Sequence, residues 1–582
     1  MGLVPVVLAV IVLAFSLTGQ QGALSSSLAP DAYSGAAAAA TLNHMATNYP
    51  HRLPGSPGDT GLAGYVATQL HDAGFNVSTT DFNGRTAIGT RQLENVVGIR
   101  AGQENGSIVI VSHRDALGSP AKAELSGTAS MLELASVLQG ETLQHTVIMA
   151  STSGSAGAAG AAALARSLPQ PVDAVIVLGD MAGTTVREPI VVPWSNTQQV
   201  APPVLRNTVA SALSAQAGLP AGSSSLLAQL AHLALPMAAT EQAPFNSSGE
   251  PAVLLSLSGE QTPSASEPVS PVQLTTTGRT LLQSVNALDT GGTVAAPSSY
   301  LSFSGKAIPA WAVRLLSLAL ILPVLMATID GFARARRRGS WVLRWLIWVL
   351  AAALPFVLAV LLVLFARAVG WISAAPPGPL DGSAINLTAG NLALLAVVAA
   401  LIVAGLLWLR RGVIALTALS GQTRPGADYG PGAAAAVLLL LCAVDLALWF
   451  SNPFAALLLA PALHLWLWIV VPEVRLPAPA TAVLLLAGLT LPVLVVVEYA
   501  TSLGHGPLTA AWSWMLLLAG GGIGFATAIV WSVFLGCVVS VIAIAVRAAG
   551  ADRPQPQPVT VRGPVTYAGP GSLGGTESAL HR

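Results

Sequence analysis

Long apolar runs fill the second half of the chain, whereas short apolar stretches alternate with polar ones before residue 300. Seven runs approach or exceed the ~20 residues that a helix needs to cross a bilayer. They lie at about 308–328, 341–366, 389–409, 432–450, 454–471, 480–498 and 523–546. Trp512–Leu518 is too short to cross, so we expect a re-entrant or interfacial piece there, with an eighth span as the alternative. The pattern predicts an all-α, multi-span membrane domain over 305–548.

The N-terminal apolar run, Leu3–Leu17, contains no charged residue and is short for a span. Its flanks lack a basic segment and a clear small-residue cleavage site. We therefore interpret residues 1–28 as a signal or anchor segment and leave its cleavage open.

Residues 29–295 have the pattern of a globular domain in which strands and helices alternate. Buried strands are expected at Asn95–Arg100, Ser107–Ser112, Thr146–Ala150, Ala174–Gly179 and Ala252–Leu257, and helices at 58–73, 126–138 and 272–288. Alternation of this kind predicts an α/β fold, with a mostly parallel sheet and helices on both of its faces.

The composition supports an integral membrane protein. Charged residues make up 9% of the chain against about 25% in a typical globular protein, and the mean hydropathy is +0.67. The net charge of +0 gives no bulk attraction to nucleic acid, so we expect none as a partner. Both cysteines, Cys442 and Cys537, lie in apolar runs, which excludes a disulfide framework.

Arginine positions predict the orientation. Arginines follow the first, third, fifth and seventh of the predicted spans, at 334–338 and 344, 410–411 and 424, 475, and 547–562. The positive-inside rule then places these loops and a disordered tail at 549–582 in the cytoplasm. We predict a multi-pass protein of the cell membrane whose 29–295 domain is extracytoplasmic and whose first partner is the lipid bilayer.

Polar residues gather where three predicted strands end. The first strand runs into His113-Arg114-Asp115, the second into Ser151–Ser155 and the third into Asp180. In sheets of this type, ligands bind beyond the carboxyl ends of the strands. Imidazole and carboxylate groups at neighbouring ends are a plausible start on a zinc site.

Several motifs in this region occur in an order and spacing typical of one family. They are His51-Arg52-Leu53-Pro54-Gly55-Ser56, Glu94-Asn95-Val96-Val97, His-x-Asp at 113–115, Ser126-Gly127-Thr128 before Met131-Leu132-Glu133, and Gly179-Asp180-Met181. Over about residues 37–289 the chain resembles the zinc exopeptidases of peptidase family M28, of the aminopeptidase Y and glutamate carboxypeptidase type.

The resemblance implies two zinc ions bridged by an aspartate, with further histidine, aspartate and glutamate ligands and a glutamate as general base. His113 matches the first ligand, Asp115 the carboxylate that orients it, and Asp180 the later aspartate ligand. The bridging aspartate is replaced by Ala123, and Glu124, one residue on, is the nearest substitute.

The other family positions are lost. The two glutamates are replaced by Gly154 and Ser155, and no histidine lies at 259–269 where the second one is expected. His113 with Asp115 then becomes a remnant hydrogen-bonded pair, and Asp180 either a turn cap or a remnant ligand.

We therefore expect no cofactor and a non-catalytic binding or scaffolding role, with a peptide or envelope protein as a further partner. One alternative is a divergent zinc aminopeptidase or carboxypeptidase that rebuilds its site from His113, Glu124, Asp180 and Glu260. Another is a transporter or lipid-handling bundle with an accessory domain.

Within the predicted membrane domain, Asp445 and His464 are ionisable residues in apolar runs on either side of Asn452-Pro453. Such groups are costly in a bilayer and need partners. They are candidates for a pair across the hairpin, and separate structural bonds between helices are the alternative.

Overall fold

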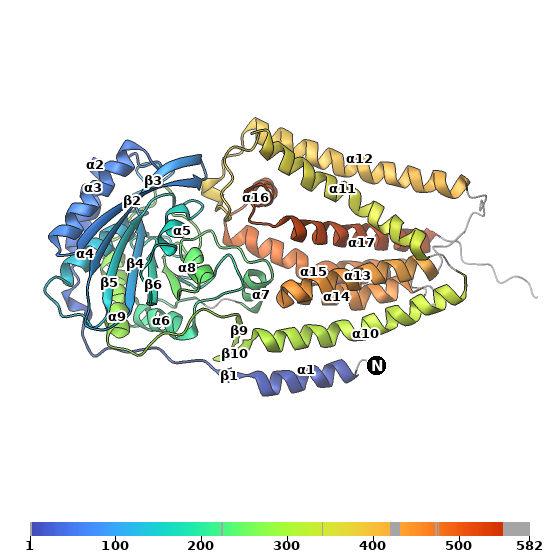
Figure 1. Cartoon of the computed structure of the whole chain (residues 1–582), viewed down its shortest axis with the longest axis horizontal. Helices are drawn as coiled ribbons and strands as arrows, with labels where there is room; N and C mark the ends of the chain where they lie inside the picture. The colour runs from blue at the N-terminus through green and yellow to red at the C-terminus, as the bar shows by residue number, and fades with distance from the viewer. Residues whose placement is uncertain are drawn as a thin grey trace, which may run out of the picture.

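The chain folds into an α/β domain at one end and a bundle of long helices at the other (Figure 1). The computed structural model describes residues 3–222, 225–339, 342–419, 431–471, 474 and 476–550. The predicted tail beyond 550 and the arginines at 424 and 475 lie outside these ranges.

The α/β domain is built on a seven-stranded mixed sheet with the order β2-β3-β5-β4-β6-β8-β7. The strands are β2 (Asn76–Thr86), β3 (Gly89–Arg100), β4 (Ser107–His113), β5 (Thr146–Thr152), β6 (Val172–Leu178), β7 (Val191–Val192) and β8 (Ala252–Leu255). The four central strands β5, β4, β6 and β8 are parallel, and the outer ones pair antiparallel. The five predicted strands are all present, whereas β2 and β7 were not predicted.

Helices cover both faces of this sheet, as the alternating pattern predicted. They are α2 (Gly35–Asn48), α3 (Pro57–Asp72), α4 (Ser126–Val137), α5 (Ala159–Ala165), α6 (Pro203–Ala217), α7 (Leu226–Ala234), α8 (Gln242–Ser248) and α9 (Pro271–Asp289), with the 3-10 turn η1 (Pro30–Ala32). Ile108 and Ile110 of β4 pack on the core with α2, α3, α4, α6 and α9. Val109 and Val111 face the opposite core with α5, α7 and α8.

The core on this second face continues into the helical domain. Val109 and Val111 belong to the same buried cluster as Phe454, Leu458 and Trp466 of the bundle. Alternating residues of β4 therefore serve two different cores, because successive side chains of a strand point to opposite faces. An apolar, fully buried strand of this kind is typical of a parallel sheet covered on both sides.

The helical domain contains seven helices long and apolar enough to span a membrane within the described residues, as predicted. Its long helices are α10 (Ala310–Arg337), α11 (Val342–Ala368), α12 (Ala389–Leu419), α13 (Pro431–Ser451), α14 (Pro453–Val470), α15 (Ala478–Ser502) and α17 (Phe525–Gly550). The predicted interfacial piece is a 14-residue helix, α16 (Pro507–Gly520), too short to cross a ~30 Å core. It lies at the end of the bundle that faces the α/β domain (Figure 1).

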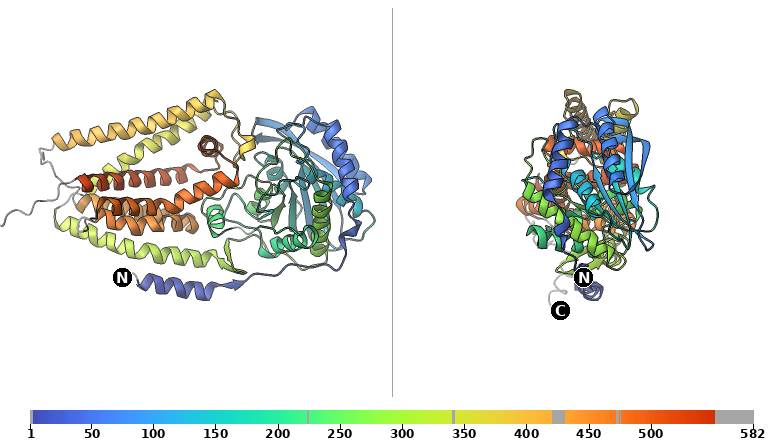
Figure 2. Two further views of the ribbon diagram at one scale, coloured as in Figure 1. Left: turned by 180° about the vertical axis from the view of Figure 1, so that it is seen from behind. Right: turned by 90° about the vertical axis from the view of Figure 1, so that its left-hand side faces the viewer.

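Two short segments join the domains at the side of the molecule. Strands β9 (Tyr300–Phe303) and β10 (Lys306–Pro309) form a hairpin that leads directly into α10. The N-terminal helix α1 (Leu3–Ser16) lies beside α10, and β1 (Thr18–Gly19) pairs with β10 (Figures 1 and 2). The short turn η2 (Gly382–Ala384) lies between α11 and α12.

The predicted pair of intramembrane residues does not form. Neither carboxylate oxygen of Asp445 has a hydrogen-bond partner in the described part of the chain, although the residue is fully buried. His464 Nε2 instead lies 3.0 Å from the carbonyl oxygen of Leu320 in α10. The hairpin at Asn452-Pro453 does bring α13 and α14 together, but the two side chains have different surroundings.

Candidate functional site

The carboxyl ends of the parallel strands open onto a small pocket of about 60 Å³. Acidic residues and one histidine line it from both domains: His113, Glu124, Asp180, Glu241, Glu260 and Asp381. The first three were predicted at this edge, and the strand order brings them together. The volume holds only a few water-sized groups and is well below the ~300 Å³ of small ligand pockets.

His113, at the end of β4, pairs with Glu241, which precedes α8. The Nδ1–Oε2 distance is 3.3 Å, and Thr152 Oγ1 donates to the other oxygen of Glu241 at 2.8 Å. Burial lowers the pKa of His113, but the hydrogen bond and charge of Glu241, with the charges of Asp115 and Glu124, outweigh it and raise the pKa to about 9. The imidazole is therefore held as a cation at neutral pH, and a metal ion would have to displace its proton to bind.

Asp115 bonds to Ser155 rather than to His113, so the expected remnant pair is not formed as a hydrogen bond. Its carboxylate accepts from Ser155 N at 3.1 Å and from Ser155 Oγ at 3.0 Å. Burial raises the pKa of Asp115 to about 6, although the charge of His113 opposes this. Ser155, which stands where the family has a glutamate, thus holds the carboxylate of Asp115 in place.

The backbone at the other lost glutamate position is suited to glycine alone. Gly154 has φ +83°, and a Cβ added there would lie 2.7 Å from Leu93 Cδ1 and 3.1 Å from Ala159 Cβ. A residue with a side chain would be strained by the dihedral angle and by these contacts. A general base at this position would require a different local backbone.

Asp180 is fully occupied as a cap. Oδ1 accepts from the backbone amides of Ala182 and Gly183 at 3.0 and 2.6 Å, and Oδ2 accepts from Ser258 Oγ at 2.7 Å. Burial raises the pKa of Asp180, and these hydrogen bonds oppose the rise. Between the two readings of Asp180 given by the sequence, the turn cap is the arrangement present.

Two further glutamates reach the pocket from other segments. Glu124 makes no hydrogen bond or ion pair within the described residues, and burial raises its pKa to about 8, against the opposing charge of His113. Glu260 Oε1 lies 3.3 Å from Nε2 of the buried His232, whereas Glu260 Oε2 has no hydrogen-bond partner among the described residues.

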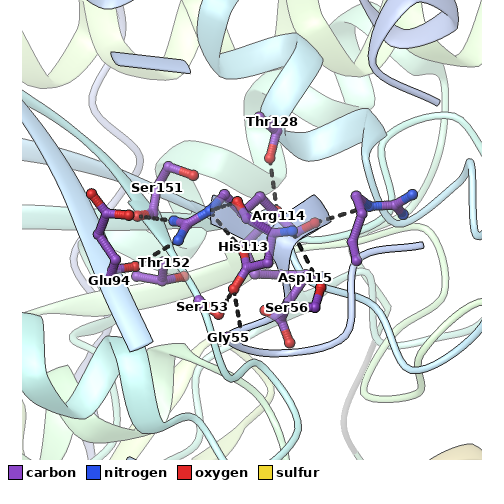
Figure 3. Close-up of polar contacts among 12 residues, drawn as sticks. Gly55, Ser56, Glu94, His113, Arg114, Asp115, Thr128, Ser151, Thr152 and Ser153 are labelled. Carbon is purple, nitrogen blue, oxygen red and sulfur yellow. Dashed lines mark hydrogen bonds and ion pairs between the residues drawn. The ribbon is translucent and has the colours of Figure 1, made fainter. Parts of the chain in front are cut away.

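Beneath the pocket, the buried Arg114 connects strands and helices (Figure 3). Its guanidinium pairs with Asp59 at 2.8 Å and donates to the carbonyl oxygens of Ser151 and Glu94 at 3.1 and 2.7 Å. Arg52 in turn donates to the carbonyl oxygen of Arg114 at 3.0 Å. The 51–56 motif therefore has a structural role, since it fastens the segment that follows β4.

These residues do not fit a zinc pair. Within the described ranges, no three histidine, cysteine, aspartate or glutamate side chains are arranged to hold a metal ion. Both oxygens of Asp180 accept hydrogen bonds from the protein, His113 is paired with Glu241, and the backbone at Gly154 excludes a carboxylate. A dinuclear site needs a bridging carboxylate and several deprotonated ligands at once.

The segment expected to carry the second histidine contacts the helical domain instead. Thr262 N donates to Asp381 Oδ2 at 2.9 Å, and Gln261 Nε2 donates to the carbonyl oxygens of Thr501 and Ser502 at 3.2 and 3.0 Å. Gly157, in the segment after β5, lies against Pro376. The edge of the sheet where ligands would bind is thus covered by the helical domain.

Fold and site together define an α/β domain of the zinc-exopeptidase type with a degenerate site, joined to a helical bundle. Residues 95–259 match the family model for peptidase family M28. The chain therefore carries an M28 peptidase-family domain, which confirms the resemblance inferred from its motifs. No curated protein matches the sequence.

Solved structures of similar proteins include a zinc aminopeptidase, BSAP, from Bacillus subtilis, with 11% identity and a TM-score of 0.35 over 44% of this chain and 94% of that one. The LapA aminopeptidase of Legionella pneumophila has 16% identity and a TM-score of 0.36, over 47% and 78% of the two chains. A glutaminyl cyclase from an Acidobacteriales bacterium has 16% identity and a TM-score of 0.37, over 47% and 100%.

Three residues of the pocket were not recognised as site residues from the family motifs. Glu241 lies between two helices that the pattern did not predict, and Asp381 lies in the connection between two predicted spans. Glu260 was weighed only as a ligand of a rebuilt zinc site, and its partner His232 was not recognised. No local sequence signal links these positions, because only the tertiary fold brings them to one pocket.

Proposed function

We propose that this is a multi-span membrane protein whose M28-type domain is non-catalytic, faces outward and acts as a rigid binding or scaffolding platform. The observation that carries the proposal is the contact of Gln261 and Thr262 with the helical domain, described above. A peptidase needs this edge open to substrate, whereas a platform benefits from a fixed junction with its membrane anchor.

Further hydrogen bonds across the junction support a rigid connection. Asn452, between α13 and α14, donates to the carbonyl oxygens of Leu233 and Ala234 at 2.7 and 3.0 Å. Tyr499 of α15 donates to the carbonyl oxygen of Leu235 at 2.5 Å, and Arg85 donates to that of Gly520 at 3.2 Å. Polar contacts spread over several helices oppose relative motion of the two domains.

The outward orientation rests on the arrangement of the helices. The ends of α10, α12 and α17 that carry arginines lie at the far end of the bundle from the α/β domain (Figure 1). By the positive-inside rule, that end is cytoplasmic.

A cysteine-labelling experiment tests the orientation. Ser78→Cys places a thiol on exposed β2, and Arg337→Cys places one at the exposed end of α10, while the native cysteines are both buried. In intact cells, a membrane-impermeant maleimide is expected to label Ser78→Cys alone. Labelling of Arg337→Cys alone would reverse the orientation.

Zinc content and peptidase activity test the loss of catalysis. The full-length protein in detergent is incubated with excess zinc, desalted and analysed for metal, and then assayed with aminoacyl p-nitroanilides. We expect well under one zinc per chain and no hydrolysis. About two zinc ions per chain, lost in His113→Ala together with hydrolysis, would overturn the proposal.

A divergent zinc exopeptidase is the second candidate, and one observation favours it. Five carboxylates and His113 line one pocket, and one carboxylate oxygen there, Glu260 Oε2, has no hydrogen-bond partner among the described residues. If this candidate is correct, Glu260→Gln and Glu241→Gln should each remove zinc and activity. If the platform is correct, neither substitution changes the metal content.

A further inference from the structure

A second pocket of about 360 Å³ lies between the α/β domain and the β9 segment that precedes the first long helix. We call it the interface pocket. Trp194, Arg206, Leu226, Gln229, Tyr300 and Phe303 are the lining residues that matter here. Its volume falls within the ~300–1,000 Å³ typical of sites for small ligands. It is separate from the pocket at the strand ends, since the two share no lining residue.

Arg206, in the first turns of α6, is the cation of this pocket and has no anionic partner. Within the described residues its guanidinium makes one hydrogen bond, from Nη2 to the carbonyl oxygen of Gly222 at 2.7 Å, and no ion pair. A guanidinium has five N–H donors. Burial lowers the pKa of Arg206, which reflects the cost of desolvating the charge. An anion in the pocket would offset this cost.

The walls around Arg206 are held in place by their own hydrogen bonds. Gln229 of α7 accepts from Ser302 N at 2.6 Å and donates to Ser302 O at 3.0 Å, and so fixes β9 against α7. Tyr300 OH donates to the carbonyl oxygen of Ala201 at 2.7 Å. Pro203 and Leu226, the first residues of α6 and α7, both line the pocket, so the positive ends of two helix dipoles add to the attraction for an anion.

Two exposed apolar side chains, together with the exposed Ser304, line the pocket near the start of the membrane domain. The side chains of Phe303 and Leu226 are 54% and 48% exposed. The strand after Phe303, β10, leads directly into α10, whose second residue Trp311 is 54% exposed. Figure 1 shows β9 and β10 between the α/β domain and α10. Exposed aromatic side chains at the end of a membrane-spanning helix are typical of the headgroup region of a bilayer.

We propose that the interface pocket binds the anionic phosphate headgroup of a membrane lipid. The phosphate lies against Arg206, and the acyl chains leave past Phe303 and Leu226 into the bilayer. An isolated guanidinium in a pocket with exposed apolar side chains near the start of the membrane domain matches an amphiphile with one negative charge. A free phosphate shares the charge chemistry but would leave these apolar side chains unused.

The test uses the full-length protein in detergent with short-chain lipids as probes. Binding of dioctanoyl phosphatidylglycerol is measured by native mass spectrometry and by the shift in thermal unfolding, against dioctanoyl phosphatidylcholine and inorganic phosphate. Arg206→Gln removes the cation, and the matched control Arg166→Gln alters an exposed arginine outside both pockets.

We expect phosphatidylglycerol to bind wild type and Arg166→Gln alike, and Arg206→Gln at least about tenfold more weakly, as loss of one charge-assisted contact predicts. If Arg206→Gln does not fold, Phe303→Ser tests the acyl contact and should weaken the same binding.

Equal affinity for phosphatidylcholine, or undiminished binding by Arg206→Gln or Phe303→Ser, would overturn the proposal. Inorganic phosphate that binds as tightly as the lipid would assign the pocket to a small anion instead.

Discussion

The α/β domain surrounds its buried Arg114 with partners, whereas the helical domain buries Asp445 without one. Arg114 is fully buried and bonds to Asp59 and to two backbone carbonyl oxygens. Asp445 is equally buried, yet neither of its oxygens has a partner among the described residues. Buried ionisable residues thus differ in what they do for the fold. Arg114 holds strands and a helix together through its bonds, whereas Asp445 contributes no bond on which the fold depends.

The same contrast explains why the degenerate site keeps its shape. Asp180 and Asp115 accept hydrogen bonds from backbone amides, so their carboxylates hold the local structure independently of any catalytic role. A buried polar group that is fully bonded stabilises its surroundings whether or not it takes part in chemistry.

Arg114→Ala should give the largest effect. It leaves Asp59 buried without its ion-pair partner, and removal of one member of a buried pair costs about 3–5 kcal/mol of unfolding free energy. Thermal unfolding of the full-length protein measures the loss. Arg91→Ala, at an exposed position of β3, is the control and should lie within about 0.5 kcal/mol of wild type.

Alkaline pH should weaken the His113–Glu241 pair. The folded-state pKa of His113 is raised from 6.5 to about 9, so the pair's contribution is complete below pH 6.5 and is lost as the pH rises through 9. We expect a loss of about 1.5–3 kcal/mol between pH 6 and pH 10.

Unfolding measured at several pH values with wild type and Glu241→Gln checks this expectation. In Glu241→Gln, the loss of unfolding free energy between pH 6 and pH 10 should be smaller than in wild type. If the variant and wild type lose the same free energy, another titrating group is responsible.

Asn452→Ala should destabilise the junction between the domains by about 1–2 kcal/mol. The substitution removes the hydrogen bonds to Leu233 and Ala234 and also the cap that accepts from Phe454 N and Ala455 N at the start of α14. Limited proteolysis between the domains and thermal unfolding both report the change. Gln198→Ala removes a single exposed bond to the Ser451 carbonyl oxygen and should have a much smaller effect.

Asp445→Asn should have the smallest effect, within about 0.5 kcal/mol, because the fold gives its carboxylate no partner to lose. The double variant with His464→Ala should be additive, since His464 contacts Leu320 instead. Loss of more than about 2 kcal/mol in the single variant, or a non-additive double variant, would show that the carboxylate is engaged and would remove the contrast between the domains.

Much of the architecture could be predicted from the sequence because it depends on local patterns. The five central strands and the seven long helices follow from runs of apolar residues of the right length. The sequence did not predict β2, the first strand of the β2–β3 hairpin. Nine of the eleven residues from Asn76 to Thr86 are at least partly exposed, and they show little apolar alternation. Strand signals are weakest where a strand has few buried residues.

The site was predicted only in part, for the same reason. His113, Asp115 and Asp180 follow strands, so their meeting at one edge could be inferred from parallel order. Their actual partners, Glu241, Ser155 and Ser258, could not be inferred, because hydrogen bonding depends on distances of a few tenths of an ångström.

The sequence by itself determined that this protein has an α/β domain with M28-type motifs and a set of long apolar helices, and it predicts an incomplete set of zinc ligands. Local hydrophobic pattern and residue identity are sufficient for each of these. The tertiary structure alone decided that the helical domain covers the edge of the sheet with its 375–381 connection and that Arg206 shares a pocket with Phe303 of β9. Both depend on contacts between segments far apart in the sequence, which no local pattern encodes.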